Sequence, residues 1–249
     1  MVYDTLFGVN QKGEIKPQMV DKWSTSKDGK TWTFTLRDGL EFHDGKPVTT
    51  EDVIASLKRW AQRDAMGGVL AKFVAGYEAV DAKTFKINLN EPCGIVLDAL
   101  GKPSPNVPFI MPKHVAETPG NTQITDFTGS GPFVFRHDLW RPGEKAVYDK
   151  FKDYKPRAEP PSALSGGKNV YLDRVEWVNI PDPQTAANAL LTGEIDMIEQ
   201  PLIELLPMFE KDKNIEIVDY NPLGSQYSFR FNVLHKPFDN PKIRQAVLY

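Results

Sequence analysis

The sequence predicts a mixed α/β fold, and three patterns of hydrophobic residues indicate it. Residues 31–36, TWTFTL, alternate between large apolar side chains and threonine, which is the period of a half-buried strand. In residues 47–60, PVTTEDVIASLKRW, apolar residues recur at i, i+4 and i+7, which is the period of a helix. Residues 175–200 then read as strand, helix and strand, an order typical of a mainly parallel sheet.

Turn residues divide the start of the chain into short strands. The glycine-containing turns QKG, KDGK and RDG lie at residues 11–13, 27–30 and 37–39, and their spacing predicts hairpins. In the strand 31–36, the hydrophobic residues share one face and are expected to point into the core.

The first helix is expected just after this strand. Val53, Leu57 and Trp60 share one helical face, and Thr49 with Asp52 three residues later is close to a capping box. A second hairpin follows in YEAVDAKTFKINLN, residues 77–90, with its turn at residues 81–83. This first part of the chain therefore reads as a small α+β unit.

The middle of the chain is rich in turn formers. Residues 92–132 read mostly as loops with one short helical candidate at 112–117. A strand pair, PFVFRH and KAVYDKF, follows at 132–137 and 145–151. Residues 154–169, YKPRAEPPSALSGGKN, are the best candidate for a linker or long loop, because their prolines and paired glycines suit neither helix nor sheet.

The last part of the chain supplies the strand-helix-strand pattern. VEWVNI is the first strand, DPQTAANALLTG the helix, stopped by Gly193, and EIDMIEQ, residues 194–200, the second strand. IEIVDY and SQYSFRFNV, residues 215–220 and 225–233, read as further strands, and NPKIRQAVLY begins another helix. Because a domain rarely stops one or two turns into an amphipathic helix, we expect the chain to be a fragment.

Composition excludes some classes of protein. The chain has 249 residues, 41% of them hydrophobic and 25% charged, with a net charge of −3, which argues against a general nucleic-acid binder. Its single cysteine, Cys93, cannot form an intramolecular disulfide or a zinc-binding pair. No apolar run approaches the roughly 20 residues of a membrane helix, and the first residues lack the features of a signal peptide. Either the protein stays in the cytoplasm or the chain lacks its true beginning.

Candidate catalytic residues have plainer structural interpretations. His43 and Asp44 could be a base with its orienting carboxylate, but adjacent turn residues point apart, and Asp-Gly is a common turn pair. Glu194 and Asp196 could be paired carboxylates, yet Gly193 beside them favours a solvated turn. The four histidines are dispersed and support no zinc site.

The glycine-rich segment GSGPF, residues 129–133, does not fit a phosphate-binding loop, because Pro132 would block the helix that such a loop needs. A close backbone approach or a bend is the better interpretation. No GxSxG motif is present, so the sequence predicts no catalytic residues and no metal site.

In this order and spacing, the motifs resemble those of the family 5 extracellular solute-binding proteins of ABC importers. Residues 2–60, from VYDTLFG to SLKRW, are similar to the signature stretch of that family. GSGPF is similar to its GTGPF segment, IPDPQTAANALLTGEIDM to its IPD segment, and FRFNVLHKPFDNPKIRQAVLY to the stretch that leads into its second lobe. Within this resemblance, the His43-Asp44 pair matches a hairpin turn of the family, which implies a scaffold role.

The resemblance implies the type II periplasmic-binding-protein fold, with two lobes, a hinge and an additional small α+β domain. Residues 1–30 and 168–225 would form the first lobe, 31–167 the additional domain, and 226–249 a hinge strand and the start of an incomplete second lobe. The export signal and most of the second lobe of full-length relatives are absent from this sequence.

Family clefts are lined by loops at strand ends, and this implies a set of ligand-binding residues. The set comprises Tyr3, Lys102, Pro103, Ser130, Gly131, Glu199, Gln200, Gln226, Tyr227 and Phe229. Lys102 matches a cleft arginine of nickel-chelate binders and could pair with a ligand carboxylate, although a solvated loop lysine is the simpler interpretation.

The resemblance further implies a protein without cofactor that captures a peptide-like solute, closes on it and docks on a membrane permease. We expect a monomer, periplasmic or lipid-anchored, that binds no nucleic acid. The alternatives are a hydrolase or transferase on a similar scaffold, which would need a constellation of catalytic groups, and a related peptide-sensing or chaperone module without a permease partner.

Overall fold

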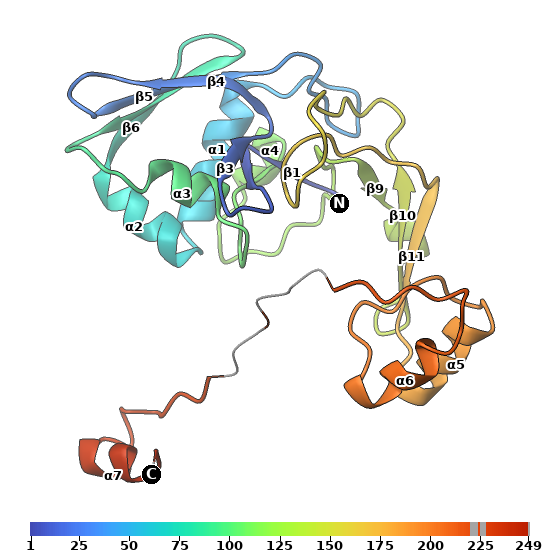
Figure 1. Ribbon diagram of the computed structural model, residues 1–249. Coiled ribbons are helices and arrows are strands. Elements are labelled where there is room, and N and C mark those ends of the chain that lie inside the picture. Colours follow the sequence, from blue (N-terminus) through green and yellow to red (C-terminus); the bar gives the residue numbers. More distant parts are fainter. Residues whose placement is uncertain (220–223, 225–227, 249) are drawn as a thin grey trace. The chain divides into compact units, whose positions relative to one another are not determined.

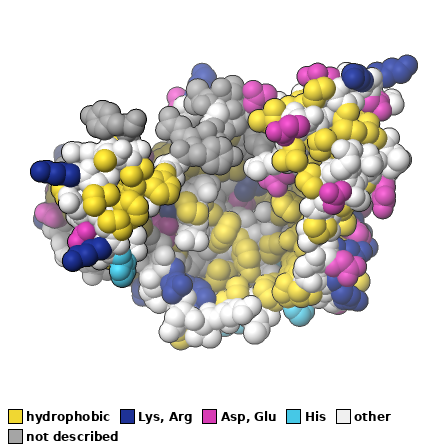
Figure 2. Space-filling model, turned by 90° about the horizontal axis from the view of Figure 1, so that it is seen from below, with side chains coloured by type: hydrophobic (Ala, Val, Ile, Leu, Met, Phe, Trp, Pro, Cys, Tyr) yellow, Lys and Arg dark blue, Asp and Glu magenta, His cyan; other side chains and the backbone are white. Residues whose placement is uncertain are grey.

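The computed structural model describes residues 1–219, 224 and 228–248 (Figure 1). The chain divides into two units, Met1–Asn179 and Ile180–Tyr249. Within the described residues, no helix combines the length and the hydropathy needed to cross a membrane. On the face that Figure 2 shows, acidic and basic side chains are mixed, in keeping with the small net charge.

An antiparallel sheet of four strands in the order β4-β5-β7-β6 dominates the first unit. Its strands are β4 (Val20–Thr25), β5 (Thr31–Leu36), β6 (Val74–Ala79) and β7 (Thr84–Leu89). Phe34 of β5 lies opposite Phe85 of β7, with ring centroids 5.1 Å apart. The two hairpins predicted at turns 27–30 and 81–83 are thereby confirmed.

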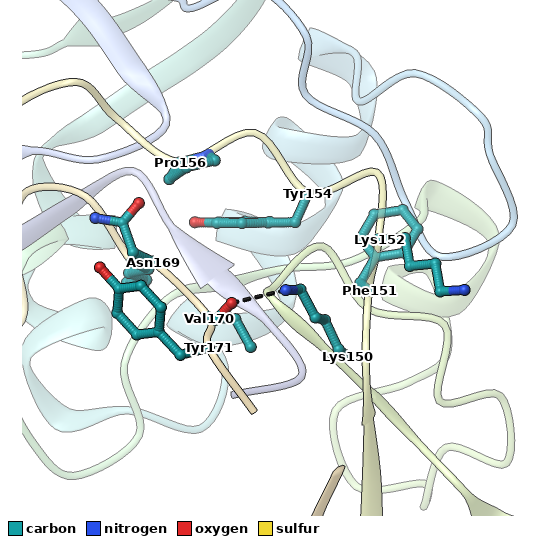
Figure 3. A pocket seen from close by; sticks show the side chains of 9 residues that line it. Lys150, Phe151, Lys152, Tyr154, Pro156, Asn169, Val170 and Tyr171 are labelled. Atoms are coloured by element: carbon teal, nitrogen blue, oxygen red, sulfur yellow. Dashed lines mark hydrogen bonds between the residues drawn. The ribbon is translucent and has the colours of Figure 1, made fainter. Parts of the chain in front are cut away.

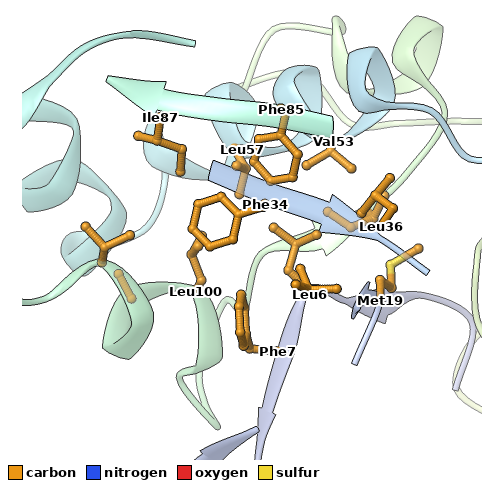
Figure 4. Packing of buried hydrophobic residues seen from close by; sticks show 14 of the residues in the cluster. Leu6, Phe7, Met19, Phe34, Leu36, Val53, Leu57, Phe85, Ile87 and Leu100 are labelled. Atoms are coloured by element: carbon orange, nitrogen blue, oxygen red, sulfur yellow. The ribbon is translucent and has the colours of Figure 1, made fainter. Parts of the chain in front are cut away.

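Helix α1 (Thr50–Ala61) supplies the other side of this core. Val53 and Leu57 lie close to the phenylalanines of the sheet, as Figure 4 shows. The predicted cap is present, because the backbone N–H of Thr49 donates to the Asp52 carboxylate over 2.8 Å.

One hydrophobic cluster joins this α+β part to the start of the chain. Leu6, Phe7 and Met19 are buried in the same cluster as Phe34 and Phe85 (Figure 4). The assignment of residues 1–30 to one lobe and 31–167 to an additional domain stays a prediction.

Several short elements complete this part of the unit. They are β1 (Asp4–Thr5), paired with β8 (Phe109–Ile110), β2 (Phe7–Val9), paired with β3 (Ile15–Pro17), and helices α2 (Ala65–Phe73), α3 (Val96–Gly101) and α4 (Lys113–Ala116). The hairpin at residues 11–13 and the short helix near 112–117 are confirmed. The prediction of loops for the rest of 92–132 was wrong for α3 and β8. In α3, burial of Val96, Ala99 and Leu100 stabilises a helix in a segment whose neighbouring prolines had indicated a loop.

A second antiparallel sheet has the order β11-β10-β9. Its strands are β9 (Phe133–Phe135), β10 (Lys145–Lys150) and β11 (Arg174–Val178), with the short helix η1 (His137–Leu139) between the first two. The predicted pairing of β9 with β10 is confirmed. The long loop 154–169 packs against β2 and β4, because Leu164 N–H donates to Val9 C=O over 2.9 Å and Arg157 donates to Val20 C=O over 2.8 Å.

The second unit is built from short helices. They are α5 (Pro183–Leu191), η2 (Ile203–Leu205), α6 (Leu206–Phe209) and α7 (Pro241–Ala246). The Asp182 carboxylate caps α5 by accepting from the N–H of Thr185 over 2.8 Å, and Gly193 follows the helix with a φ of +75°. The predicted helix is therefore confirmed at both ends.

The predicted strands of this unit are corrected by the structure. Residues 194–200, 215–219 and 228–233 form no strand, and every strand pairing in the described part of the chain is antiparallel. A strand persists only where a neighbour accepts and donates its backbone hydrogen bonds, and these segments have no such neighbour among the described residues. An alternating apolar pattern therefore did not suffice to form a strand in these segments.

Candidate functional site

Tyr3, Ser130 and Gly131 come together at strand β1. The Ser130 hydroxyl donates to Ile110 C=O over 2.7 Å and accepts from Asp4 N–H over 3.0 Å, so it links β1 to β8. Gly131 N–H donates to Val2 C=O over 2.8 Å. In this arrangement the Ser130 hydroxyl and the Gly131 N–H are both engaged by the backbone around them.

The GSG segment, residues 129–131, approaches the first residues too closely for a side chain. A Cβ added at Gly129 would lie 1.9 Å from the carbonyl oxygen of Val2, and one at Gly131 would lie 2.3 Å from that of Met1. These distances are far inside van der Waals contact. The predicted close backbone approach is confirmed.

The His43 ring forms hydrogen bonds with both glycines of the GSG segment. Its Nε2–H donates to Gly131 C=O over 2.9 Å, and its Nδ1 accepts from Gly129 N–H over 3.1 Å. A carbonyl can only accept and an amide can only donate, so this geometry selects the neutral ring with the proton on Nε2. Asp44 instead pairs with Lys46, and the predicted scaffold role of His43 agrees with these contacts.

Acidification is expected to weaken this junction. Burial lowers the pKa of His43 below its usual value near 6.5, despite the opposing effects of the Gly131 carbonyl and Asp44. A depressed folded-state pKa means that its stabilising contribution is present above the unfolded value and is lost as pH falls through the folded value. Urea unfolding at pH 7.5 and 5.0 should show a smaller loss of stability in His43→Gln than in the unmodified protein; an equal loss in both would contradict this.

Tyr3 differs from its neighbours because its hydroxyl is unused. The phenol oxygen is buried and has no hydrogen-bond partner among the described residues, while the ring lies 5.7 Å from that of Phe109. Burial, helped by the charge of Asp126, raises the pKa of Tyr3 to about 12, so the phenol keeps its proton. A buried hydroxyl without a partner is costly, and an incoming acceptor would relieve that cost.

Lys102 lies at the end of α3 and is engaged in an ion pair. Its ammonium lies 2.5 Å from the Asp64 carboxylate, and the two side chains are only 12% and 4% exposed. Neither a free ligand contact nor a solvated lysine describes it in this structure. Pro103, the next residue, is exposed.

Asp64 was missed by the sequence analysis. It caps α2 by accepting from Gly67 N–H over 2.8 Å. Burial acts to raise the pKa of Asp64, but the hydrogen bonds from Lys102 and Gly67 outweigh it and lower the pKa. An aspartate directly before the apolar run AMGGVLAKF was the available signal for the cap, whereas nothing local indicated Lys102, 38 positions away.

The remaining predicted ligand residues belong to the second unit. Glu199 and Gln200 are exposed in a segment without regular structure. Phe229 is 79% exposed, with its ring edge-on to that of Phe231. Gln226 and Tyr227 lie outside the described residues.

No metal centre is evident from the side chains. Over residues 1–219, 224 and 228–248, no three histidine, cysteine, aspartate or glutamate residues gather in a way that could hold an ion. The absence of a cofactor and of catalytic residues remains an expectation.

Comparison with known sequences connects the whole chain to one family. Residues 14–249 match the sequence model of bacterial extracellular solute-binding proteins, family 5 Middle. The chain is 45% identical, over its full length, to the probable peptide ABC transporter periplasmic-binding protein y4tO of Sinorhizobium fredii, of which it covers 46%. It is 30% identical over 99% of its length to the glutathione-binding protein GsiB of Escherichia coli K12, again covering 46% of that protein.

Comparison with solved structures supports the fold. The crystal structure of NikZ from Campylobacter jejuni, in complex with Ni(L-His), superposes on the whole chain with a TM-score of 0.74 at 25% identity, and the chain covers 47% of it. The predicted mixed α/β class is confirmed, and the likeness agrees with part of a type II periplasmic-binding-protein fold. The chain spans about half the length of the curated relatives it matches.

Proposed function

Because the chain belongs to family 5 of the bacterial extracellular solute-binding proteins, we propose that it forms part of the substrate-binding component of an ABC transporter. The protein would capture a peptide-like solute and release it unchanged. The match across residues 14–249, together with 45% identity to a probable peptide-binding relative, carries this proposal.

The mechanism is capture by closure. Residues 1–30 and 168–225 would belong to one lobe, 31–167 to an additional domain, and 226–249 to the hinge and the start of a second lobe. A ligand favours the closed state only by binding it more tightly than the open state, so contacts from both lobes would drive closure. No bond is made or broken, and neither a catalytic residue nor a cofactor is needed.

The proposed ligand contacts are the residues expected from the sequence, with roles refined by their surroundings. Tyr3 offers a buried hydroxyl that lacks an acceptor among the described residues. Lys102 would hold a ligand carboxylate only in competition with Asp64, which already occupies its ammonium. Ser130 and Gly131 would act mainly by holding Tyr3 in place. Glu199, Gln200, Gln226, Tyr227 and Phe229 would contribute from the other proposed segments.

The proposed setting follows from the same relatives. A protein of this kind works outside the cytoplasmic membrane, either free in the periplasm or lipid-anchored, and delivers its solute to a membrane permease. We propose a monomer that does not bind nucleic acid.

Native mass spectrometry tests the function directly. It should be run on this chain and on any longer natural protein that contains it, before and after mild denaturation to release bound molecules. A co-purified mass that matches short peptides, and rebinding of an added tripeptide such as glutathione, are expected for the longer protein. An unchanged apo mass across peptide mixtures would contradict peptide binding, and conversion of any added solute would overturn the proposal of a protein without catalysis.

Tyr3→Phe separates the ligand role of this residue from a structural one. Removing a buried hydroxyl that has no partner among the described residues should raise the free energy of unfolding of the ligand-free protein by about 1 kcal/mol. The same change should weaken peptide binding several-fold, because the hydroxyl no longer donates to the ligand. Thermal unfolding and calorimetric titration check both effects, and a stabilised variant with unchanged affinity would remove Tyr3 from the proposed site.

A further inference from the structure

One cavity of the first unit is lined by none of the predicted ligand residues. It has a volume of about 310 Å³ and lies between the end of β10 and the residues that lead into β11 (Figure 3). Lys150, Phe151, Tyr154, Lys168, Asn169 and Tyr171 are among the residues that line it. This volume is at the lower end of the range of about 300 to 1,000 Å³ that small-molecule sites occupy.

The charge of this cavity is one-sided. Its lining includes Lys150, Lys152 and Lys168 but no aspartate or glutamate. Lys168 is neutralised by Asp4, whose carboxylate lies 2.6 Å from its ammonium. A cavity lined by a single sign of charge concentrates ions of the opposite sign.

Lys150 is the partly buried lysine of this lining that has no carboxylate partner among the described residues. It is half-buried, and its ammonium donates to the carbonyl oxygen of Val170 over 2.8 Å, an interaction drawn in Figure 3. None of the ion pairs in the described part of the chain includes Lys150. Charged groups withdrawn from water are normally paired, and an ammonium can donate three hydrogen bonds.

Aromatic and amide groups form the opposite part of the lining. Figure 3 shows the phenol of Tyr154 directed toward Asn169 and Tyr171. The Tyr154 hydroxyl donates to Asp4 over 2.8 Å, so its oxygen can only accept another hydrogen bond. Tyr171 is 87% exposed, which leaves a large ring at the edge of the cavity. Aromatic side chains beside convergent polar groups are typical of sites for organic ligands rather than simple ions.

We propose that this cavity binds a small organic carboxylate. The carboxylate would accept from the Lys150 ammonium and from the amide of Asn169, while its organic part would lie against the rings of Tyr154 and Tyr171. This site goes beyond the proposed transport function, because it shares no residue with the predicted transport cleft.

Calorimetric titration with sodium benzoate tests the proposal on the whole chain. Benzoate is expected to bind, and the neutral isostere benzamide should bind at least about tenfold more weakly, because it has no negative charge to pair with the Lys150 ammonium. Lys150→Gln should weaken benzoate binding by about the same factor. Lys22→Gln is the matched control, since Lys22 is an exposed lysine on strand β4, outside the lining of the cavity. It should leave the affinity unchanged.

Two further measurements keep the outcome decisive. Tyr171→Ala changes a side chain that is already 87% exposed, so it should fold normally and still weaken benzoate binding several-fold. No binding of benzoate at millimolar concentration, or equal binding in the unmodified protein, Lys150→Gln and Tyr171→Ala, would overturn the site. Inorganic phosphate binding as tightly as benzoate would overturn its assignment to an organic ligand.

Discussion

Replacing Lys102 by methionine is expected to lower the free energy of unfolding by about 3 kcal/mol, because it leaves the Asp64 carboxylate buried without its counter-ion. The two side chains are 12% and 4% exposed and lie 2.5 Å apart, so solvent offers the remaining charge little compensation. Methionine keeps the length and the apolar stem of lysine, and the loss therefore reports the charge rather than packing. A lysine reserved for ligand would show almost no effect on the ligand-free protein.

A double-mutant cycle by urea unfolding measures this interaction. Asp64→Asn retains an oxygen that can cap α2, and the pair Asp64→Asn with Lys102→Met should cost clearly less than the sum of the two single changes. Additive costs, or a Lys102→Met variant as stable as the unmodified protein, would show that the pair does not form in solution.

The same pair predicts a pH dependence. Because the pKa of Asp64 is lowered in the folded protein, its stabilising contribution is present above the unfolded value of about 4 and is lost as pH falls through the folded value. In Lys102→Met this carboxylate loses its main stabilising partner, so its folded-state pKa should rise and the stability lost between pH 7 and pH 3 should be smaller than in the unmodified protein. A profile of unfolding free energy from pH 7 to pH 3 checks the shift.

Gly129→Ala is expected to cost about 3 kcal/mol or more, since overpacking a rigid contact forces the backbone to move. The added Cβ would lie 1.9 Å from the carbonyl oxygen of Val2 and 2.8 Å from Cε1 of His43. Neither group can move freely, because His43 is held by hydrogen bonds to Gly129 and Gly131. The variant should separate the GSG segment from the first residues and displace Tyr3.

Gly94→Ala is the matched control for this change. A Cβ at Gly94 meets nothing within 4 Å, and its φ is not positive, so its effect should stay within about 0.5 kcal/mol. Thermal unfolding compares the two variants. If Gly129→Ala melted at the temperature of Gly94→Ala, the close approach seen in the structure would not persist in solution.

Local patterns were enough for elements whose signals lie within one short segment. The alternation in β5, the spacing of Val53, Leu57 and Trp60 in α1, and the cap at Thr49 could be predicted, because each depends on residues a few positions apart. The turns could be predicted for the same reason, because each depends on neighbouring residues. Helix α3 was not predicted, because only its burial in the common core outweighs the prolines around it.

The contacts of the candidate site residues were harder to predict than the helices and strands. Ser130 and Lys102 could be located by resemblance to a family, yet the sequence could not show that Ser130 bridges two strands or that Lys102 pairs with Asp64. The partners of Ser130 are 20 and 126 positions away, and that of Lys102 is 38 positions away. Contacts over such separations arise from the path of the chain, which no local pattern encodes.

The sequence by itself determined the mixed α/β class, the hairpins, the first helix and the family, because periodicity, turn residues and ordered motifs are properties of the chain in one dimension. Only the tertiary structure decided which polar groups are already used and which remain available. Ser130, His43 and Lys102 are engaged with distant partners. Among the described residues, the hydroxyl of Tyr3 has no hydrogen-bond partner, and the ammonium of Lys150 has a carbonyl acceptor but no counter-ion. The physical reason is that burial and hydrogen-bond satisfaction depend on the neighbours that folding brings together.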